Sequence, residues 1–219
     1  AQSATTVGDG NLNITTADGS AALNLSSYAE SVPSAKGRIQ SSAYAIAESI
    51  NNNSDINVDA EAFNTVTGAG ATLSSLSTAS STSASQGDTV MASASYTLNI
   101  NGVDITTGYV AMDTATATGT GTSQTINATA NLTADPIVAA INEKSDETDV
   151  TAQVVNDGGV SKIQLNSLSG GNIAVSEMVT NTSGYTGSTG LVLSTTNGTS
   201  FTSFRGSVEI GADNGITVD

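Results

Sequence analysis

Hydrophobic and polar residues alternate in short runs along much of the chain, and this alternation predicts β-strands. Within residues 96–175 the runs fall at 98–100, 103–105, 150–154, 163–165 and 173–175. Asn101-Gly102 separates the first two runs and is a strong hairpin signal, because both residue types tolerate positive φ. The segment therefore predicts several antiparallel strands joined by tight turns, among them Asp157-Gly-Gly159 and Ser169–Asn172.

In two other stretches the apolar residues recur with the spacing of a helical face, and this spacing predicts two short helices. In the first stretch the apolar face consists of Ala43, Ile46, Ala47 and Ile50. Ser41 or Ser42 would cap this helix, and Asn51–Asn53 would end it. In the second stretch the face consists of Ile137, Ala140, Ile141 and Lys144, after Asp135 as the N-cap and Pro136 as the first helical residue.

The two helices belong to an internal repeat. Residues 46–51 match residues 137–142, and with one residue inserted 58–62 match 150–154. The hairpin that follows the second copy, 162–165 and 173–175, has its counterpart at 205–210 and 216–218, near the C-terminal end of the sequence. Another hairpin is expected around Asp18-Gly19, between Leu12-x-Ile14 and Leu23-x-Leu25.

These patterns predict an α+β, β-rich fold of two small domains, each with antiparallel hairpins packed on one short helix. Residues 1–70 and 195–219 would form a discontinuous inner domain. Residues 90–180 would form an outer domain inserted into it, with connectors at 71–89 and 181–194. Closing a longer loop costs little extra entropy, so such an insertion is tolerated. The alternative is two sequential domains whose last strands lack partners.

Composition limits the function classes. Among 219 residues, 5 Lys and Arg face 20 Asp and Glu, a formal net charge of −15. The cations are scattered, so neither nucleic acid nor an anionic membrane is an expected partner. No apolar run is long enough to predict a membrane span. Aromatic residues make up 4% of the chain, so the cores should be small and aliphatic.

The chain contains no Cys and no His, which removes the usual thiolate and imidazole nucleophiles, bases and metal ligands. Serines are plentiful, but no motif singles one out. We therefore expect no enzyme, cofactor or metal site. Two carboxylate pairs, Asp55/Asp59 and Asp146/Asp149, are expected to be solvated turn residues rather than catalytic groups or Ca²⁺ ligands. The five tyrosines are expected to pack in the core or on strands rather than bind sugar: Tyr28, Tyr44, Tyr96, Tyr109 and Tyr185.

The repeat resembles the one found in bacterial flagellins and in the related filament-cap protein. The resemblance rests on residues 98–105, on the helix ending Ile141-Asn142, and on Val150-Thr-Ala152. The ending 205–218 resembles the closing strands of a flagellin's central variable region. The Ser/Thr-rich loops take no part in the resemblance.

The resemblance implies a secreted, extracellular structural subunit of the flagellar filament, used in motility. This region would form the exposed, antigenic outer domains. Its partners would be neighbouring flagellin subunits, reached mainly through terminal helices that this sequence lacks, so the isolated chain is expected to be monomeric. The Ser/Thr-rich segments 74–85 and 180–190 are candidates for O-linked glycans. Two alternatives stay open: the middle of the filament-cap protein, and a surface adhesin module that binds carbohydrate or calcium.

Overall fold

The computed structural model describes residues 12–16, 19–23, 34–68, 76–77, 81–84, 89–116, 124–126, 129–130, 134–181, 198–211 and 216–218. The N-terminal elements are β1 (Leu12–Thr16), β2 (Gly19–Leu23), α1 (Ala43–Asn51) and β3 (Asp59–Thr67). The middle of the chain forms β4 (Leu76–Ser77), β5 (Ser81–Ala84), β6 (Thr89–Ile100), β7 (Val103–Thr116), β8 (Gln124–Ile126) and β9 (Thr129–Ala130). Then follow α2 (Ala134–Glu143), α3 (Ser145–Thr148), β10 (Val150–Asp157), β11 (Val160–Ser167), β12 (Ile173–Asn181), β13 (Gly198–Phe204), β14 (Ser207–Gly211) and β15 (Ile216–Val218).

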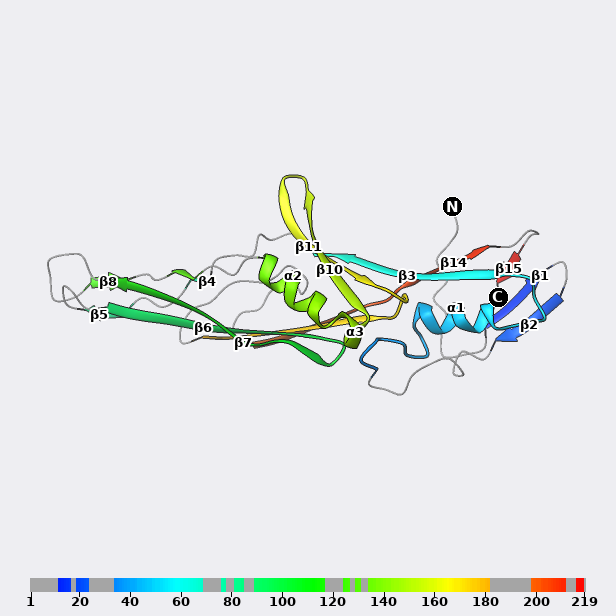
Figure 1. Ribbon diagram of the computed structural model, residues 1–219, viewed down its shortest axis with the longest axis horizontal. Helices are drawn as coiled ribbons and strands as arrows, with labels where there is room; N and C mark the ends of the chain where they lie inside the picture. The colour runs from blue at the N-terminus through cyan, green and yellow to red at the C-terminus, as the bar shows by residue number, and fades with distance from the viewer. Residues whose placement is uncertain are drawn as a thin grey trace.

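All strand pairs in the described residues are antiparallel. They build two four-stranded sheets, β10-β11-β3-β14 and β13-β12-β6-β7, a three-stranded sheet β15-β1-β2, and the pairs β4-β9 and β5-β8. The elements follow one another along a long axis, with β1, β2 and β15 at one end and β5 and β8 at the other (Figure 1). The protein is thus α+β and β-rich with few short helices, as the alternation predicted.

Two hydrophobic clusters form the core of the described residues, and both are aliphatic. The smaller cluster lies between α1, β3, β1 and β14 and contains Ile14, Ile50, Ile56 and Val58. The larger cluster joins α2 to strands of both four-stranded sheets: Leu98, Ile100, Ile105, Ile137, Ile141, Val150, Ala152, Ile163, Leu165, Ile173 and Val175. Strand β3 serves both clusters, since Ala60 packs on the smaller one and Val66 on the larger one.

The two copies of the repeat have the same strand register. Ala60 of β3 lies opposite Ile210 of β14, and its counterpart Ala152 of β10 lies opposite Leu165 of β11. These are the equivalences that the internal repeat predicted. In each copy the helix packs on the strand that follows it, α1 on β3 and α2 on β10.

The equivalence extends to a strand that the sequence comparison missed. Ile14 of β1 lies opposite Val218, and Ile100 of β6 lies opposite Val175. Both strands carry the same tripeptide, Leu12-Asn-Ile14 and Leu98-Asn-Ile100. The signal was present, but three residues are too short to stand out in a chain rich in Asn and aliphatic residues.

Two predicted hairpins were wrong. Strand β11, which contains 163–165, does not pair with β12, which contains 173–175, and β14, which contains 207–210, does not pair with β15 (Ile216–Val218). In each case the two strands lie in different sheets.

Most of the predicted turns and caps are found. Asn101 and Gly102 have φ of 53° and 86° and join β6 to β7. Ser42 caps α1, and its Oγ accepts a hydrogen bond from the Ala45 amide at 3.2 Å. The predicted start of α2, with Asp135 as the N-cap and Pro136 as the first helical residue, was wrong by two residues. The helix begins at Ala134, which places Asp135 inside the first turn rather than at the cap. A carboxylate there still stabilises the positive end of the helix.

Some strand pairs join segments that were expected to belong to one domain, and others join the two expected domains to each other. From the segment 195–219, β14 pairs with β3 and β15 with β1, whereas β13 pairs with β12 of the segment 90–180. Strand β11 also pairs with β3. The expected connector 71–89 contains β4 and β5, and the connector 181–194 lies outside the described residues beyond Asn181. Independent folding of two domains stays a prediction.

Candidate functional site

The most elaborate polar contacts of the described residues lie where the segment before α1 meets the second copy of the repeat. Here two stretches of backbone touch. The Asn172 amide donates to the Gly37 carbonyl oxygen at 2.9 Å. Gly37 has φ of +66°, and a Cβ there would overlap the carbonyl of Asn172. Gly170 is similar, because a Cβ would lie 2.6 Å from the Ala62 backbone. Only glycine permits this approach. We call this contact region the junction; it comprises 34–38, 62–64, 148–149, 167–172 and 204–206.

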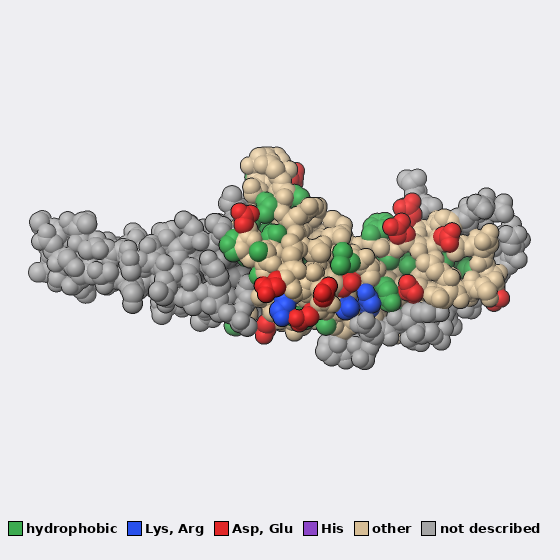
Figure 2. All heavy atoms as spheres, in the orientation of Figure 1, with side chains coloured by type: hydrophobic (Ala, Val, Ile, Leu, Met, Phe, Trp, Pro, Cys, Tyr) green, Lys and Arg blue, Asp and Glu red, His purple; other side chains and the backbone are tan. Residues whose placement is uncertain are grey.

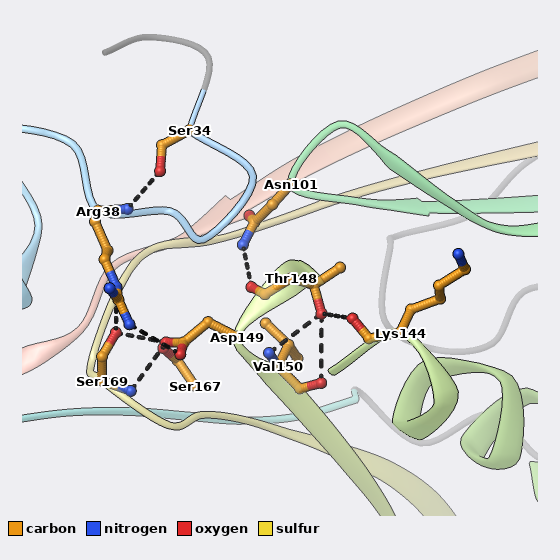
Figure 3. Close-up of polar contacts among 9 residues, drawn as sticks. All are labelled: Ser34, Arg38, Asn101, Lys144, Thr148, Asp149, Val150, Ser167 and Ser169. Atoms are coloured by element: carbon orange, nitrogen blue, oxygen red, sulfur yellow. Dashed lines mark hydrogen bonds and ion pairs between the residues drawn. The ribbon is translucent and has the colours of Figure 1, made fainter. Parts of the chain in front are cut away.

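An ion pair crosses the junction (Figure 3). Arg38 Nη2 lies 3.2 Å from Asp149 Oδ1, and Arg38 Nε donates to Ser169 Oγ at 3.2 Å. The Arg38 guanidinium also lies over the Tyr44 ring, 4.6 Å from its centroid. The face of an aromatic ring attracts a cation, so this contact stabilises the guanidinium. The arginine thus ties the start of the first helix to the end of α3, 111 positions along the chain.

Asp149 is the acceptor at the centre of the junction. Asp149 is 7% exposed. Its φ of 61° is a left-handed conformation that ends α3. Its Oδ2 accepts from Ser167 Oγ at 3.3 Å, from the Ser169 amide at 3.0 Å and from Ser169 Oγ. The expectation that Asp149 is a solvated turn residue was therefore wrong. Three donors and one arginine satisfy a carboxylate that burial would otherwise destabilise.

Two buried asparagines join strands from distant segments. Asn64 Nδ2 donates to the carbonyls of Gly171 at 2.9 Å and Phe204 at 3.1 Å. Asn101 exchanges two hydrogen bonds with Ala174, both 2.8 Å, and its Nδ2 donates to the Thr148 carbonyl at 3.3 Å. Primary amides offer donors and an acceptor without a charge, so they satisfy backbone groups where no second strand can reach.

The other candidate residues are not brought together. Asp55, Asp59 and Asp146 are exposed. Tyr44 packs under Arg38, and Tyr96 lies opposite Tyr109 in the β6–β7 register. Tyr28 and Tyr185 lie outside the described residues. Within the described part of the chain, no three acidic residues are placed so that they would hold a metal ion.

One shallow hollow, with a volume of about 240 Å³, opens on the β10-β11-β3 sheet. Its lining is Thr65, Thr151, Ala152, Gln153, Gln164 and Asn166. These side chains bond to one another across the strands, Gln153 to Gln164 at 2.7 Å and Thr65 to Asn166 at 2.8 Å. The lining contains no acid, base or activated nucleophile, so the hollow supplies no general acid–base chemistry.

Charged groups elsewhere form surface pairs. The Glu147 carboxylate, hydrogen-bonded to Lys144, raises the pKa of that amine. Lys162 donates to Asp157 and lowers the pKa of its carboxyl group. Acidic side chains are spread over the described part of the face shown in Figure 2, and the basic ones lie near the middle of the molecule beside acidic neighbours. No described helix has the length and hydrophobicity needed to cross a bilayer.

The fold and the junction define the class of protein: an elongated, β-rich chain built from two similar units that interlock through backbone contacts and one ion pair. Comparison of the chain with protein-family models and with curated proteins finds no match.

Proposed function

We propose that this chain forms the outer, surface-exposed region of a bacterial flagellin, a non-enzymatic structural subunit of the extracellular flagellar filament. The observation that carries the proposal is the repeated unit. The motif that resembles the flagellin repeat occurs twice, and both copies have the same strand register and the same helix-on-strand packing. A chain with two such units suits an outer region built from more than one domain.

The arrangement of the ends supports the proposal. The first and last described strands, β1 and β15, pair with each other, with Ile14 opposite Val218. The first and last described strands therefore lie in the same part of an elongated body (Figure 1). A body that the chain enters and leaves near one end suits a projection carried on the wall of a larger assembly, which would hold its neighbouring subunits through other segments.

The surface and the junction agree with a structural role. A net charge of −15 keeps closely spaced copies soluble through mutual repulsion. The junction is closely packed, because the backbone at Gly37 and Gly170 approaches other segments so nearly that a Cβ would not fit. The hydrogen bonds and the ion pair described there join separate segments of the chain, which is the chemistry of a scaffold.

The test is immunogold electron microscopy of the bacterium that encodes the chain, with antibodies raised against the purified protein. The proposal predicts label along the whole length of the flagellar filaments. Label confined to the distal tip would support the filament-cap alternative instead. Label on the cell body would support the adhesin alternative. Antibody absorbed with the purified chain is the control, and a strain deleted for the gene should lose the label.

A further inference from the structure

The turn between β6 and β7 contains a dipeptide that is prone to spontaneous deamidation, Asn101-Gly102. Glycine has no side chain to shield its backbone nitrogen. In the reaction the Gly102 nitrogen attacks Cγ of Asn101. An N–Cγ bond forms, the Cγ–Nδ2 bond breaks, and ammonia leaves with the proton that the Gly102 nitrogen carried. One water molecule then opens the cyclic imide to aspartate or isoaspartate.

Hydrogen bonds engage both reacting groups in the folded chain. The Gly102 amide donates to Asn99 Oδ1 at 2.9 Å. Asn101 Oδ1 accepts from the Ala174 amide at 2.8 Å, and Asn101 Nδ2 donates to the Thr148 carbonyl at 3.3 Å (Figure 3). Attack on Cγ turns the planar carboxamide into a tetrahedral centre, so these bonds must break first. Asn101 is also 7% exposed, which restricts the water that opens the imide.

Asn99 is positioned to hold the Gly102 amide because it is itself fixed. It lies on β6 opposite Asp104 of β7, and its Nδ2 donates to Asp104 Oδ1 at 3.0 Å. This cross-strand bond leaves Asn99 Oδ1 to accept from Gly102 across the turn. The Gly102 amide must give up its proton to a base before it attacks, and a proton held by Asn99 is not accessible to hydroxide.

We propose that Asn101-Gly102 is a deamidation site that the fold keeps unreactive, and that Asn99 is the residue that protects it. The site then reacts only in chains in which the β6–β7 turn has opened. Its product is harmful to the fold, because a carboxylate oxygen replaces the donor to the Thr148 carbonyl at a buried position. Thr148 precedes Asp149, so the reaction removes a bond that ties the turn to the junction. Deamidation at Asn101 is therefore an irreversible mark on chains that have opened.

The test is peptide mapping by mass spectrometry of the purified chain, incubated at neutral pH either folded or in urea. Each hydrogen bond that must break slows the reaction by about two- to tenfold. Conversion of Asn101 should therefore be at least about tenfold slower in the folded chain than in urea. Asn99→Ala should speed conversion in the folded chain by about two- to tenfold and leave the rate in urea unchanged. Asp104→Ala, an exposed change that frees Asn99, should give a smaller acceleration.

Two control variants separate local protection from general instability. Asn51→Ala also loses two side-chain hydrogen bonds, but these bonds hold Ala60 in the first copy of the repeat, so conversion at Asn101 should not change. Asp157→Asn puts the same dipeptide in an exposed turn, before Gly158, where nothing lies within 4 Å of the Cβ position. This exposed site should convert in the folded chain at about the rate measured in urea.

Amide NMR spectra show that each variant is folded before incubation. Equal conversion of Asn101 in the folded chain and in urea would overturn the inference. Equal acceleration by Asn99→Ala and Asn51→Ala would overturn the role of Asn99, and so would no acceleration by Asn99→Ala. If the exposed site of Asp157→Asn also stayed unconverted, the bonds at Asn101 would not explain its slow reaction. Asn101→Asp should melt below the wild-type chain, and an unchanged Tm would contradict the harmful effect. None of these results depends on the proposed filament role.

Discussion

The side-chain amide of Asn142 holds the backbone of Ala152 with two hydrogen bonds: Nδ2 donates to the Ala152 carbonyl at 3.0 Å, and Oδ1 accepts from the Ala152 amide at 2.7 Å. Asn51 and Ala60 form the same pair in the first copy, at 2.8 and 2.7 Å. Each asparagine sits at the end of a helix and holds the strand that packs on it. We call this the asparagine clamp.

Removing a clamp should loosen its strand. Asn142→Ala and Asn51→Ala each lose two hydrogen bonds, so each should lower the free energy of unfolding by about 1–3 kcal/mol. Asn→Asp at the same positions is the matched comparison: it keeps the acceptor for the alanine amide, but it loses the donor and sets a carboxylate oxygen against the alanine carbonyl, so it too should destabilise the strand. Urea unfolding measures the difference. An unchanged midpoint for both alanine variants would mean that the clamps contribute nothing.

The glycines of the junction should be less replaceable than glycines in open turns. Gly37→Ala should cost about 3 kcal/mol or more, from a positive φ together with an overlap against the Asn172 carbonyl. Gly158 has φ of +63° with nothing within 4 Å of its Cβ position, so Gly158→Ala should cost only about 1–2 kcal/mol. Chemical denaturation of the two variants compares them directly. Equal losses would show that the backbone contact at the junction is not rigid.

Arg38 and Asp149 should be coupled energetically. Arg38→Met keeps an unbranched apolar side chain but leaves the Asp149 carboxylate without its cation. It should cost about 2 kcal/mol, less than a fully buried pair because the Arg38 side chain is 23% exposed. Asp149→Asn retains a residue type that tolerates positive φ. The double variant should be less destabilised than the sum of the two single changes. If the two single changes are additive in a double-mutant cycle, the ion pair does not stabilise the junction.

Glu61 and Glu209 lie directly opposite each other on β3 and β14, and both are exposed. Like charges at paired positions destabilise a sheet. Glu209→Lys should therefore raise the free energy of unfolding by about 0.2–1 kcal/mol, and Glu209→Gln should give a smaller gain. The gain from Lys should shrink as salt is added. Melting curves in low and high salt provide the test, and a destabilised Lys variant would contradict it.

The two-domain prediction can be tested by burying a charge in one core at a time. Ile141→Asp should remove amide protection from residues 90–180 and from the end of β3 that pairs with β11, because Ile141 is fully buried in the larger core. Residues of α1 and β14 should stay protected. Ile50→Asp, in the smaller core, should show the reverse. Loss of protection throughout the chain in both variants would mean that the shared strand β3 makes one cooperative unit.

Local features were readable from the sequence because their causes are local. Asn101-Gly102 favours a hairpin turn, and the spacing of Ile46 and Ile50 favours a helix with one apolar face. The repeat also predicted which residues of distant strands are equivalent: Ala60 with Ala152 and Ile210 with Leu165. The structure then pairs Ala152 with Leu165 and Ala60 with Ile210. The clamps had a signal as well: Ile-Asn ends both helical stretches, although the pattern alone does not say what the asparagine binds.

By itself the sequence determined the two helices, the hairpins β1–β2, β6–β7 and β10–β11, the aliphatic nature of the cores and the duplication, because alternation, helical spacing and turn chemistry act between neighbouring residues. Only the tertiary structure decided that Asp149 is buried against Arg38, that Gly37 touches Asn172, and that β13 pairs with β12. These contacts join residues far apart in the chain. Their geometry depends on how the two units approach each other, and no pattern within either segment records that approach.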